Sequence, residues 1–160
     1  ALVIKPQIGG GAWRQVLLRC DDEFPTEEKL PPAAALIQAY LPGVCSEGEY
    51  SLLIIDGEYS HAAVKRPKSG DYRIQSIYGG TEEAYHPSDT EIQTAKRVVA
   101  SLDVVPLYAR VDLLRGQDGE LKLIELELIE PYLYLTHATG AGDENAGAEK
   151  IAAALSTRLR

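Results

Sequence analysis

The stretch 108–131, YARVDLLRGQDGELKLIELELIEP, determines how the rest of the chain is interpreted. Its centre is Asp118-Gly119, which lies between two apolar runs. This dipeptide predicts a β-hairpin with a two-residue turn, because both central residues of such a turn need a positive φ. A hairpin that turns there pairs residues whose numbers sum to 237, so Asp112 would lie opposite Glu125.

The same register gathers acids on one face of the hairpin. Arg110 would lie opposite Glu127, and since side chains alternate along a strand, all four side chains project to one side. The leucines expected to share this acidic face, and to bury it in part, are Leu114, Leu121 and Leu123. The residues expected on the other face are Val111, Leu113, Ile124 and Leu126.

Opposed carboxylates on a half-buried sheet repel each other, and one arginine does not neutralise three acids. A divalent cation would remove this conflict, because Mg²⁺ takes hard oxygen ligands from carboxylates. The alternative is a solvated acidic edge with an Arg–Glu ion pair and no metal. A three-residue turn would remove the basis for the predicted pairing.

The composition is that of a globular protein. With 160 residues, 45% hydrophobic and 25% charged, the chain is expected to form one compact domain or two small lobes. The net charge of −8 argues against a nucleic-acid surface, and no apolar run approaches the ~20 residues of a membrane span. Cys20 and Cys45 lack metal-site spacing and are expected to be buried thiols in a reducing cytoplasm. The chain has no Met and begins in a β run, so we expect a parent protein to continue upstream.

Other segments predict antiparallel strands with a few helices, and therefore an α+β fold. A second hairpin is expected around Asp56-Gly57, and Ser88-Asp89-Thr90-Glu91 is a capping box that predicts the start of a helix. Further strands are expected over 2–5, 14–19 and 71–78, and a last helix over 148–159.

A glycine triplet, Gly9, Gly10 and Gly11, joins the first two predicted strands. A strand, a glycine loop and a second strand can bring backbone N–H groups close to a phosphate. The segment is not a Walker loop, which needs GxxxxGK[ST] at the start of a helix. A flexible turn is the commoner meaning of a glycine triplet.

Five motifs in order resemble the ATP-grasp fold, and most closely its glutathione-synthetase-type carboxylate–amine ligases. They are VIKP with the glycine loop, QAYLPG followed by GE, GDYRIQ followed by GG, the ARVD strand, and ELELIEP. The resemblance implies antiparallel sheets with flanking helices, in two lobes around a nucleotide cleft. It implies part of a small lobe over 1–41, a large lobe over 42–160, and a substrate domain upstream of this chain.

The resemblance also implies a role for individual residues, with ATP and Mg²⁺ (or Mn²⁺) as cofactors. The residues that would contact the nucleotide are Lys5, Gly9, Gly10 and Gly11 at the phosphates, Gln38, Ala39, Tyr40 and Leu41 at the adenine edge, and Glu49 at the ribose. The residues that would face the transferring phosphoryl group are Lys65, Arg73 and Gln75. The implied metal ligands are Asp112, Glu125 and Glu127.

The implied activity is ATP-dependent formation of a C–N bond from a small-molecule carboxylate and an amine, through an acyl phosphate, in the cytoplasm. Relatives often form dimers or tetramers, so a homo-oligomer is compatible with the resemblance. No nucleic-acid or membrane partner and no Ser-His-Asp set is expected, and His61, His86 and His137 are interpreted as surface or turn residues. Two rival interpretations stay open: a non-catalytic ATP- and Mg-binding scaffold or regulatory domain, and an α+β interaction domain whose acidic face is structural.

Two residues depart from the family pattern. Glu127 stands where relatives commonly have Asn, which adds a negative charge. Arg110 stands where a small residue is common, and it can offset that charge. A further phosphate-binding lysine of the relatives is absent from these 160 residues, so the isolated chain is expected to be inactive and to bind nucleotide weakly or not at all.

Overall fold

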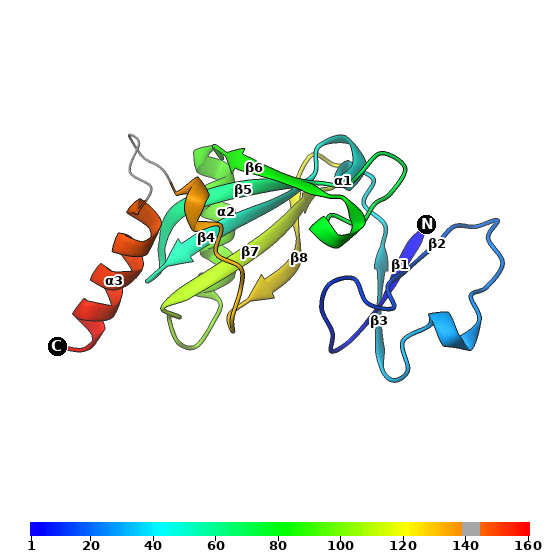
Figure 1. Ribbon diagram of the computed structural model, residues 1–160, viewed down its shortest axis with the longest axis horizontal. Coiled ribbons are helices and arrows are strands. Elements are labelled where there is room, and N and C mark those ends of the chain that lie inside the picture. Colours follow the sequence, from blue (N-terminus) through cyan, green and yellow to red (C-terminus); the bar gives the residue numbers. More distant parts are fainter. Residues whose placement is uncertain (139–144) are drawn as a thin grey trace. The chain divides into compact units, whose positions relative to one another are not determined.

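The structure, a computed structural model, describes residues 1–138 and 145–160 (Figure 1). The chain divides into two compact units, Ala1–Pro42 and Gly43–Arg160. Both are built on antiparallel sheets with few helices, so the predicted α+β class is confirmed. Their assignment as a small and a large lobe stays a prediction. No helix among the described residues combines the length and the apolar character needed to cross a bilayer.

The first unit is a three-stranded sheet in which β1 (Leu2–Pro6) lies between β2 (Val16–Leu18) and β3 (Ala35–Ala39). Both outer strands run antiparallel to β1. β2 is shorter than the predicted strand over 14–19. Arg14 has a φ of 51° and therefore still belongs to the turn that precedes β2.

The second unit is a five-stranded sheet in the order β6-β5-β4-β7-β8. Its strands are β4 (Glu49–Ile55), β5 (Glu58–Arg66), β6 (Thr81–Tyr85), β7 (Tyr108–Arg115) and β8 (Leu121–Glu127). Its helices are α1 (Gly43–Ser46), α2 (Asp89–Ala100) and α3 (Ala146–Arg158). Every residue of the central strand β4 is buried, because both faces of the sheet are covered at this strand.

One face of the five-stranded sheet, the helix face, packs against α2. The helix starts with the predicted capping box: the Ser88 hydroxyl accepts a hydrogen bond from the Glu91 backbone N–H, and the Glu91 carboxylate accepts one from the Ser88 backbone N–H. Ala95 and Val99 of α2 belong to one buried apolar cluster with side chains of β4, β5 and β7. The main hydrophobic core therefore lies on this face.

The opposite face, the acid face, is covered in part by residues 132–138, which we call the cover segment. Tyr134 of this segment packs against Leu53 and Ala63 of the sheet. His61 of β5 places its Nε2 2.7 Å from the Leu133 carbonyl oxygen. His61 is only 5% exposed, so its interpretation as a surface or turn residue was wrong. The cover segment is thus joined to the sheet by both apolar and polar contacts.

The turn between β7 and β8 differs from the predicted one. Gly119 has a positive φ of 80° but Asp118 does not, and the Gly116 N–H donates to the Glu120 carbonyl at 2.8 Å. The loop is therefore three residues long, and partners near it have numbers that sum to 236. As a result Leu121 lies opposite Arg115 and packs against the core of the helix face, not on the acid face.

A β-bulge at Ile124 then restores the predicted register. Leu113 pairs with Leu123, whereas its neighbour Asp112 pairs with Glu125, which leaves Ile124 without an opposite residue. The sequence prediction named the wrong turn but the right partners for the acids. The two deviations cancel because the loop takes its extra residue from the β7 side, whereas the bulge places one extra residue on β8.

The second hairpin has the predicted turn, but its register shifts after the turn. Its predicted turn is present, with φ values of 51° at Asp56 and 80° at Gly57. A bulge at Ser60 follows, since Ile54 pairs with Tyr59 but Leu53 pairs with His61. Beyond the bulge, Glu49 lies opposite Lys65.

The predicted strand over 71–78 was wrong. The Asp71 carboxylate accepts hydrogen bonds from the backbone N–H groups of Tyr72 and Arg73, which favours a local turn over a strand. The edge strand β6 lies just beyond this loop. Its sequence TEEAY is largely exposed, and it lacks the apolar alternation that would have predicted it. Cys20 and Cys45 are exposed, so their prediction as buried thiols was also wrong.

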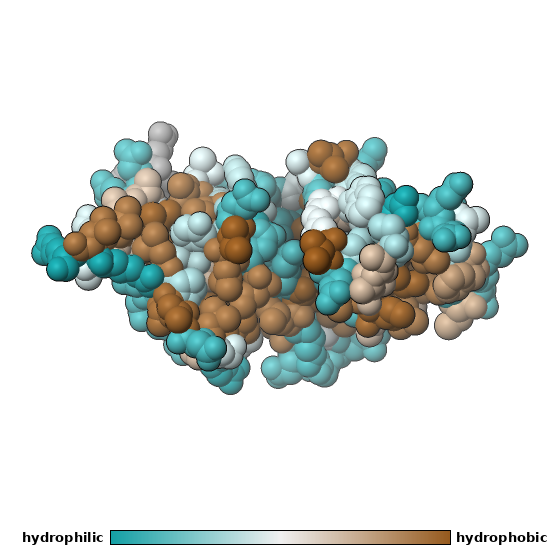
Figure 2. All heavy atoms as spheres, turned by 90° about the horizontal axis from the view of Figure 1, so that it is seen from below, coloured by the Kyte–Doolittle hydropathy of each residue, from teal (hydrophilic) through white to brown (hydrophobic). Residues whose placement is uncertain are grey.

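The last helix, α3, is hydrogen-bonded to the start of β5 and to the turn before it. Lys150 donates to the Ser60 carbonyl at 3.0 Å, at the bulge, and Arg158 donates to the Asp56 carboxylate at 2.5 Å. Leu155 of α3 and Leu159, directly after the helix, are 43% and 78% exposed. Figure 2 shows brown, apolar surface gathered along this helix at the left of the view.

Candidate functional site

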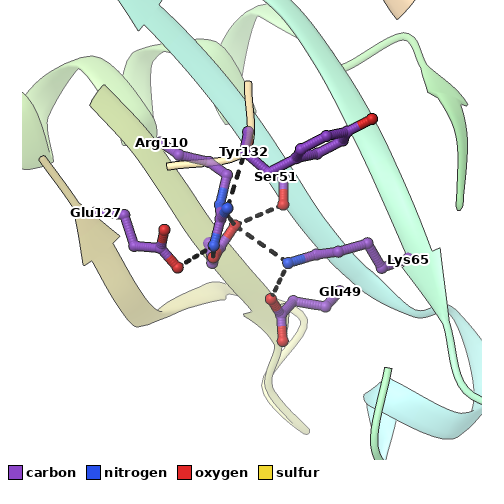
Figure 3. A network of polar contacts seen from close by, with 7 residues as sticks. Glu49, Ser51, Lys65, Arg110, Glu127 and Tyr132 are labelled. Atoms are coloured by element: carbon purple, nitrogen blue, oxygen red, sulfur yellow. Dashed lines mark hydrogen bonds and ion pairs between the residues drawn. The ribbon is translucent and has the colours of Figure 1, made fainter. Parts of the chain in front are cut away.

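A buried network of ion pairs centres on Asp112 (Figure 3). Asp112 is 0% exposed. Its Oδ1 accepts a hydrogen bond from Ser51 Oγ at 2.5 Å, and Lys65 Nζ lies 3.4 Å from the same oxygen. Its Oδ2 accepts from Arg110 Nε at 3.0 Å and from Arg110 Nη2 at 2.9 Å. Both carboxylate oxygens therefore face donors.

Three neighbouring strands bring these side chains together. Ser51 of β4 is the register partner of Asp112 on β7, and Glu49 of β4 is the register partner of Lys65 on β5. Partners that lie directly opposite project from the same face. Lys65 Nζ donates to Glu49 Oε1 at 2.5 Å, with side chains only 8% and 11% exposed.

Arg110 extends the network to β8 and to the cover segment. Its Nη2 donates to a Glu127 carboxylate oxygen, and its Nη1 lies 3.4 Å from the Tyr132 carbonyl oxygen. The guanidinium also lies over the Tyr134 ring, 5.9 Å from the centroid. One cation thus joins two acids and the segment that covers them.

Burial and charge act in opposite directions on these groups. Burial alone would lower the pKa of Lys65, but the carboxylates of Glu49 and Asp112 outweigh it and hold that pKa above its ordinary value. Burial alone would raise the pKa of Asp112, but Lys65, Arg110 and the Ser51 hydroxyl outweigh it and hold that pKa below its ordinary value. For Glu49, burial outweighs the attraction of Lys65 and raises its pKa. Asp112 and Lys65 are therefore charged at neutral pH.

The three acids predicted from the central hairpin lie together. Asp112, Glu125 and Glu127 each offer a carboxylate oxygen, and these oxygens lie within 4.8 Å of one another. The triad grades from buried Asp112 to exposed Glu125. Hard oxygen donors at this spacing suit Mg²⁺ or Mn²⁺, so the residues present fit a divalent cation. Their role as metal ligands stays a prediction.

The predicted catalytic residues occupy two different places. Lys65 lies in the buried network, next to Asp112. Arg73 lies in the loop after β5, where it donates to Asp71 Oδ2 at 2.7 Å and stacks over the Tyr78 ring at 3.8 Å. Gln75 belongs to the same loop, and its Oε1 is buried without a hydrogen-bond partner among the described residues.

The residues predicted to contact the nucleotide divide between the two units. Lys5 lies in β1, opposite Leu36 of β3, and the glycine triplet follows in the loop before β2. The other first-unit residues of this set are Gln38 and Ala39 at the end of β3 and Tyr40 and Leu41 just after it. Glu49 belongs to the second unit, where Lys65 holds it in the buried network. Contact of any of these residues with ATP stays a prediction.

Sequence reasoning missed two residues of the network. Ser51 follows Glu49 at a spacing of two in a predicted strand, which placed it on the same face, but the pairing of β4 with β7 was not predicted. Tyr134 sits in the cover segment with a φ of 48°, and no sequence pattern pointed to its position against the sheet. Both residues join the network through contacts between segments far apart in the chain, which local sequence patterns do not predict.

Residues 24–128 match the family model described as "Prokaryotic glutathione synthetase, ATP-grasp domain". The chain is 33% identical over 134 residues to the cycloserine biosynthesis protein DcsG of Streptomyces lavendulae, which covers 78% of this chain and 42% of that protein. It is 30% identical over 131 residues to the glutathione synthetase of Parasynechococcus marenigrum, and this match covers 76% of this chain and 41% of that protein. The matched parts therefore span less than half the length of these relatives.

Solved structures agree with the sequence matches. The crystal structure of the D-cycloserine synthetase DcsG superposes with a TM-score of 0.72 at 26% identity, over 99% of this chain and 56% of that one. The ATP-grasp ligase PsnB, solved with a precursor variant, Mg and ADP, superposes with a TM-score of 0.65 at 23% identity. This superposition covers 97% of this chain and 46% of the PsnB chain. At that identity PsnB supports the fold alone.

Proposed function

The chain belongs to the ATP-grasp domain family of prokaryotic glutathione synthetases, and from this membership we propose that it is part of an ATP-dependent carboxylate–amine ligase. The proposed reaction transfers the γ-phosphoryl group of ATP to a carboxylate. An amine then attacks the acyl phosphate, which gives an amide or a related C–N bond, ADP and phosphate. The observation that carries the proposal is the acid triad on one face of the sheet, next to two buried cations.

The residues on the acid face suit the charges of this reaction. A carboxylate and ATP are both negative, so they approach each other only where positive charge compensates. Asp112, Glu125 and Glu127 would hold Mg²⁺ or Mn²⁺, which supplies that charge at the phosphate oxygens. Lys65 and Arg110 are buried cations in the same network. We propose that Lys65, with Arg73 and Gln75 of the following loop, faces the phosphoryl group.

The first unit supplies most of the proposed nucleotide contacts, and Glu49 of the second unit would bind the ribose. Lys5 and Gly9–Gly11 would bind phosphates, and the backbone of 38–41 would bind the adenine edge. Glycines without side chains let backbone N–H groups approach a phosphate closely. Enclosure of the reacting groups would protect the acyl phosphate from water.

Isothermal titration of the whole protein with Mg·ATP tests the proposal. We expect binding that is lost, or weakened by ten-fold or more, in Asp112→Asn and Glu125→Gln. Absence of binding, or binding that neither substitution changes, would contradict the proposed function. Release of phosphate on addition of candidate acids and amines separates a ligase from a non-catalytic ATP-binding scaffold, which would release none.

A further inference from the structure

Arg110 occupies the space between two of the three triad acids. Its guanidinium contacts both oxygens of Asp112, and its Nη2 also donates to Glu127. The side chain is only 9% exposed, so these bonds are shielded from water. A planar guanidinium offers donors in a fixed fork, which suits the bridging of two carboxylates.

Donors already occupy the lone pairs of Asp112. A carboxylate has about four lone-pair positions, two on each oxygen. Oδ1 faces Ser51 Oγ, Arg110 Nε and Lys65 Nζ, and Oδ2 faces Arg110 Nε and Nη2. A metal ion needs a lone pair that points at it. Asp112 can therefore bind a metal only when a present donor moves away, and Arg110 makes three of these contacts.

The charges of the site lead to the same conclusion. The network and the triad contain four acids, Glu49, Asp112, Glu125 and Glu127, and two cations, Lys65 and Arg110. Their formal charges therefore sum to −2. One divalent cation would neutralise this charge, and a polyphosphate would allow more positive charge to enter. Without Arg110 the sum would be −3, which attracts a metal ion more strongly.

We propose that Arg110 is an internal competitor of the metal ion: it holds Asp112 and Glu127 in the nucleotide-free protein and yields them when a metal–nucleotide complex binds. The phosphates of that complex give the guanidinium an alternative anionic partner. Arg110 thereby limits metal binding in the absence of nucleotide and couples the two ligands. This inference rests on the proposed function, because it assumes that the triad is the metal site.

Binding of Mn²⁺ to the whole protein, followed by the electron paramagnetic resonance signal of free Mn²⁺, tests the coupling. MnCl₂ is titrated alone and again with saturating ADP. For the natural sequence we expect weak binding of Mn²⁺ alone and at least ten-fold tighter binding with ADP. In Arg110→Met we expect Mn²⁺ alone to bind about ten-fold more tightly, because one positive charge has been removed from beside the ligands. The ratio of the Mn²⁺ affinity with ADP to the Mn²⁺ affinity without ADP is then smaller than in the natural sequence.

Arg115→Met is the matched control. Arg115 lies on the same strand but bonds Glu47 and Glu91, outside the triad. We expect its Mn²⁺ affinities to equal those of the natural sequence. If Arg110→Met does not fold, Arg110→Lys decides, because an ammonium group cannot span both acids as the guanidinium fork does. A rise in its affinity for Mn²⁺ alone supports the proposal, and an unchanged or lower affinity overturns it.

The outcomes separate this inference from the proposed function. Tight binding of Mn²⁺ alone by the natural sequence would overturn the inference and leave the function standing. So would an Arg110→Met variant whose affinity for Mn²⁺ alone is unchanged, provided that ADP still tightens binding. Failure of the natural sequence to bind Mn²⁺ even with ADP would overturn the proposed function, and the inference with it.

Discussion

The two faces of the five-stranded sheet are equally buried at the centre but are built from different chemistry. On the helix face, Leu52, Val111 and Leu113 pack against α2 in an apolar core. On the acid face, Ser51 and Asp112 are as completely buried, yet they are polar and charged. Since successive residues alternate between faces, both environments are encoded in the same strands.

This difference indicates which face carries function. Apolar packing would stabilise both faces, and well-packed apolar replacements of buried ion pairs are often neutral or stabilising. A buried carboxylate that is held by two cations and a hydroxyl is therefore expected to stabilise the fold less than apolar packing would. Its presence is more easily explained by chemistry at the acid face than by folding.

Removal of one cation from the acid face is expected to have the largest effect on stability. Lys65→Met leaves Glu49 and Asp112 buried with fewer partners and should lower the free energy of unfolding by about 3–5 kcal/mol. The double variant Glu49→Gln with Lys65→Met removes both charges of the pair and should be more stable than the single variant. Urea unfolding measures both. A double variant that is no more stable than Lys65→Met would show that the loss does not come from a buried carboxylate left without its cation, and the contrast between the faces would fail.

A cavity on the helix face should have the next largest effect. Leu113 is 0% exposed in the core, and Leu113→Ala should lower the free energy of unfolding by about 3 kcal/mol. Its register partner Leu123 is 50% exposed at the edge of the same sheet, so Leu123→Ala should change it by less than about 1 kcal/mol. Equal effects in urea unfolding would contradict the assignment of the core to this face.

Local signals in the sequence predicted one part of this contrast well. The capping box of Ser88 and Glu91 and the Asp56-Gly57 turn each depend on a few adjacent residues, and both are present. The pairing of Asp112 with Glu125 was also predicted correctly, although through a wrong turn. Side-chain alternation gave the face of each acid once the partner was right.

Bulges and long-range pairing were not predictable from these local signals. The bulge at Ser60 places Lys65 opposite Glu49, and a regular hairpin from Asp56-Gly57 would have placed Val64 there. A bulge adds one unpaired residue, and its position depends on packing across the whole sheet. Ser51 joined the network for a similar reason, because its partner Asp112 is 61 residues away.

The loop after β5 was predicted least well. Arg73 was assigned to a strand, but Asp71 accepts hydrogen bonds from the Tyr72 and Arg73 backbone N–H groups and from the Arg73 side chain. Such contacts compete with strand pairing. The strand lies instead at 81–85, where two glutamates and high exposure leave no apolar pattern that would predict it.

The smallest predicted effect concerns a charge at the margin of the helix face. Burial opposes ionisation of Glu91, but hydrogen bonds from Ser88, Arg115 and Tyr85 outweigh it and hold the pKa of Glu91 below its ordinary value. A carboxyl with a lowered pKa stabilises the fold above its unfolded pKa, and this stabilisation disappears as the pH falls through the folded pKa. The natural sequence should therefore lose stability as the pH falls below about 5, in part through Glu91.

Glu91→Gln separates the charge from the cap. Glutamine at this position can still accept a hydrogen bond from the Ser88 backbone N–H, so the capping box remains while the ion pair with Arg115 is lost. We expect Glu91→Gln to be less stable than the natural sequence by about 1 kcal/mol at pH 7, and this difference to shrink toward pH 3. Glu91→Ala, which also loses the cap, should be less stable than Glu91→Gln at both pH values. The difference in free energy of unfolding between Glu91→Gln and the natural sequence is measured by urea unfolding at both pH values. If this difference does not depend on pH, Glu91 acts through its shape and hydrogen bonds, and its charge does not stabilise the helix face.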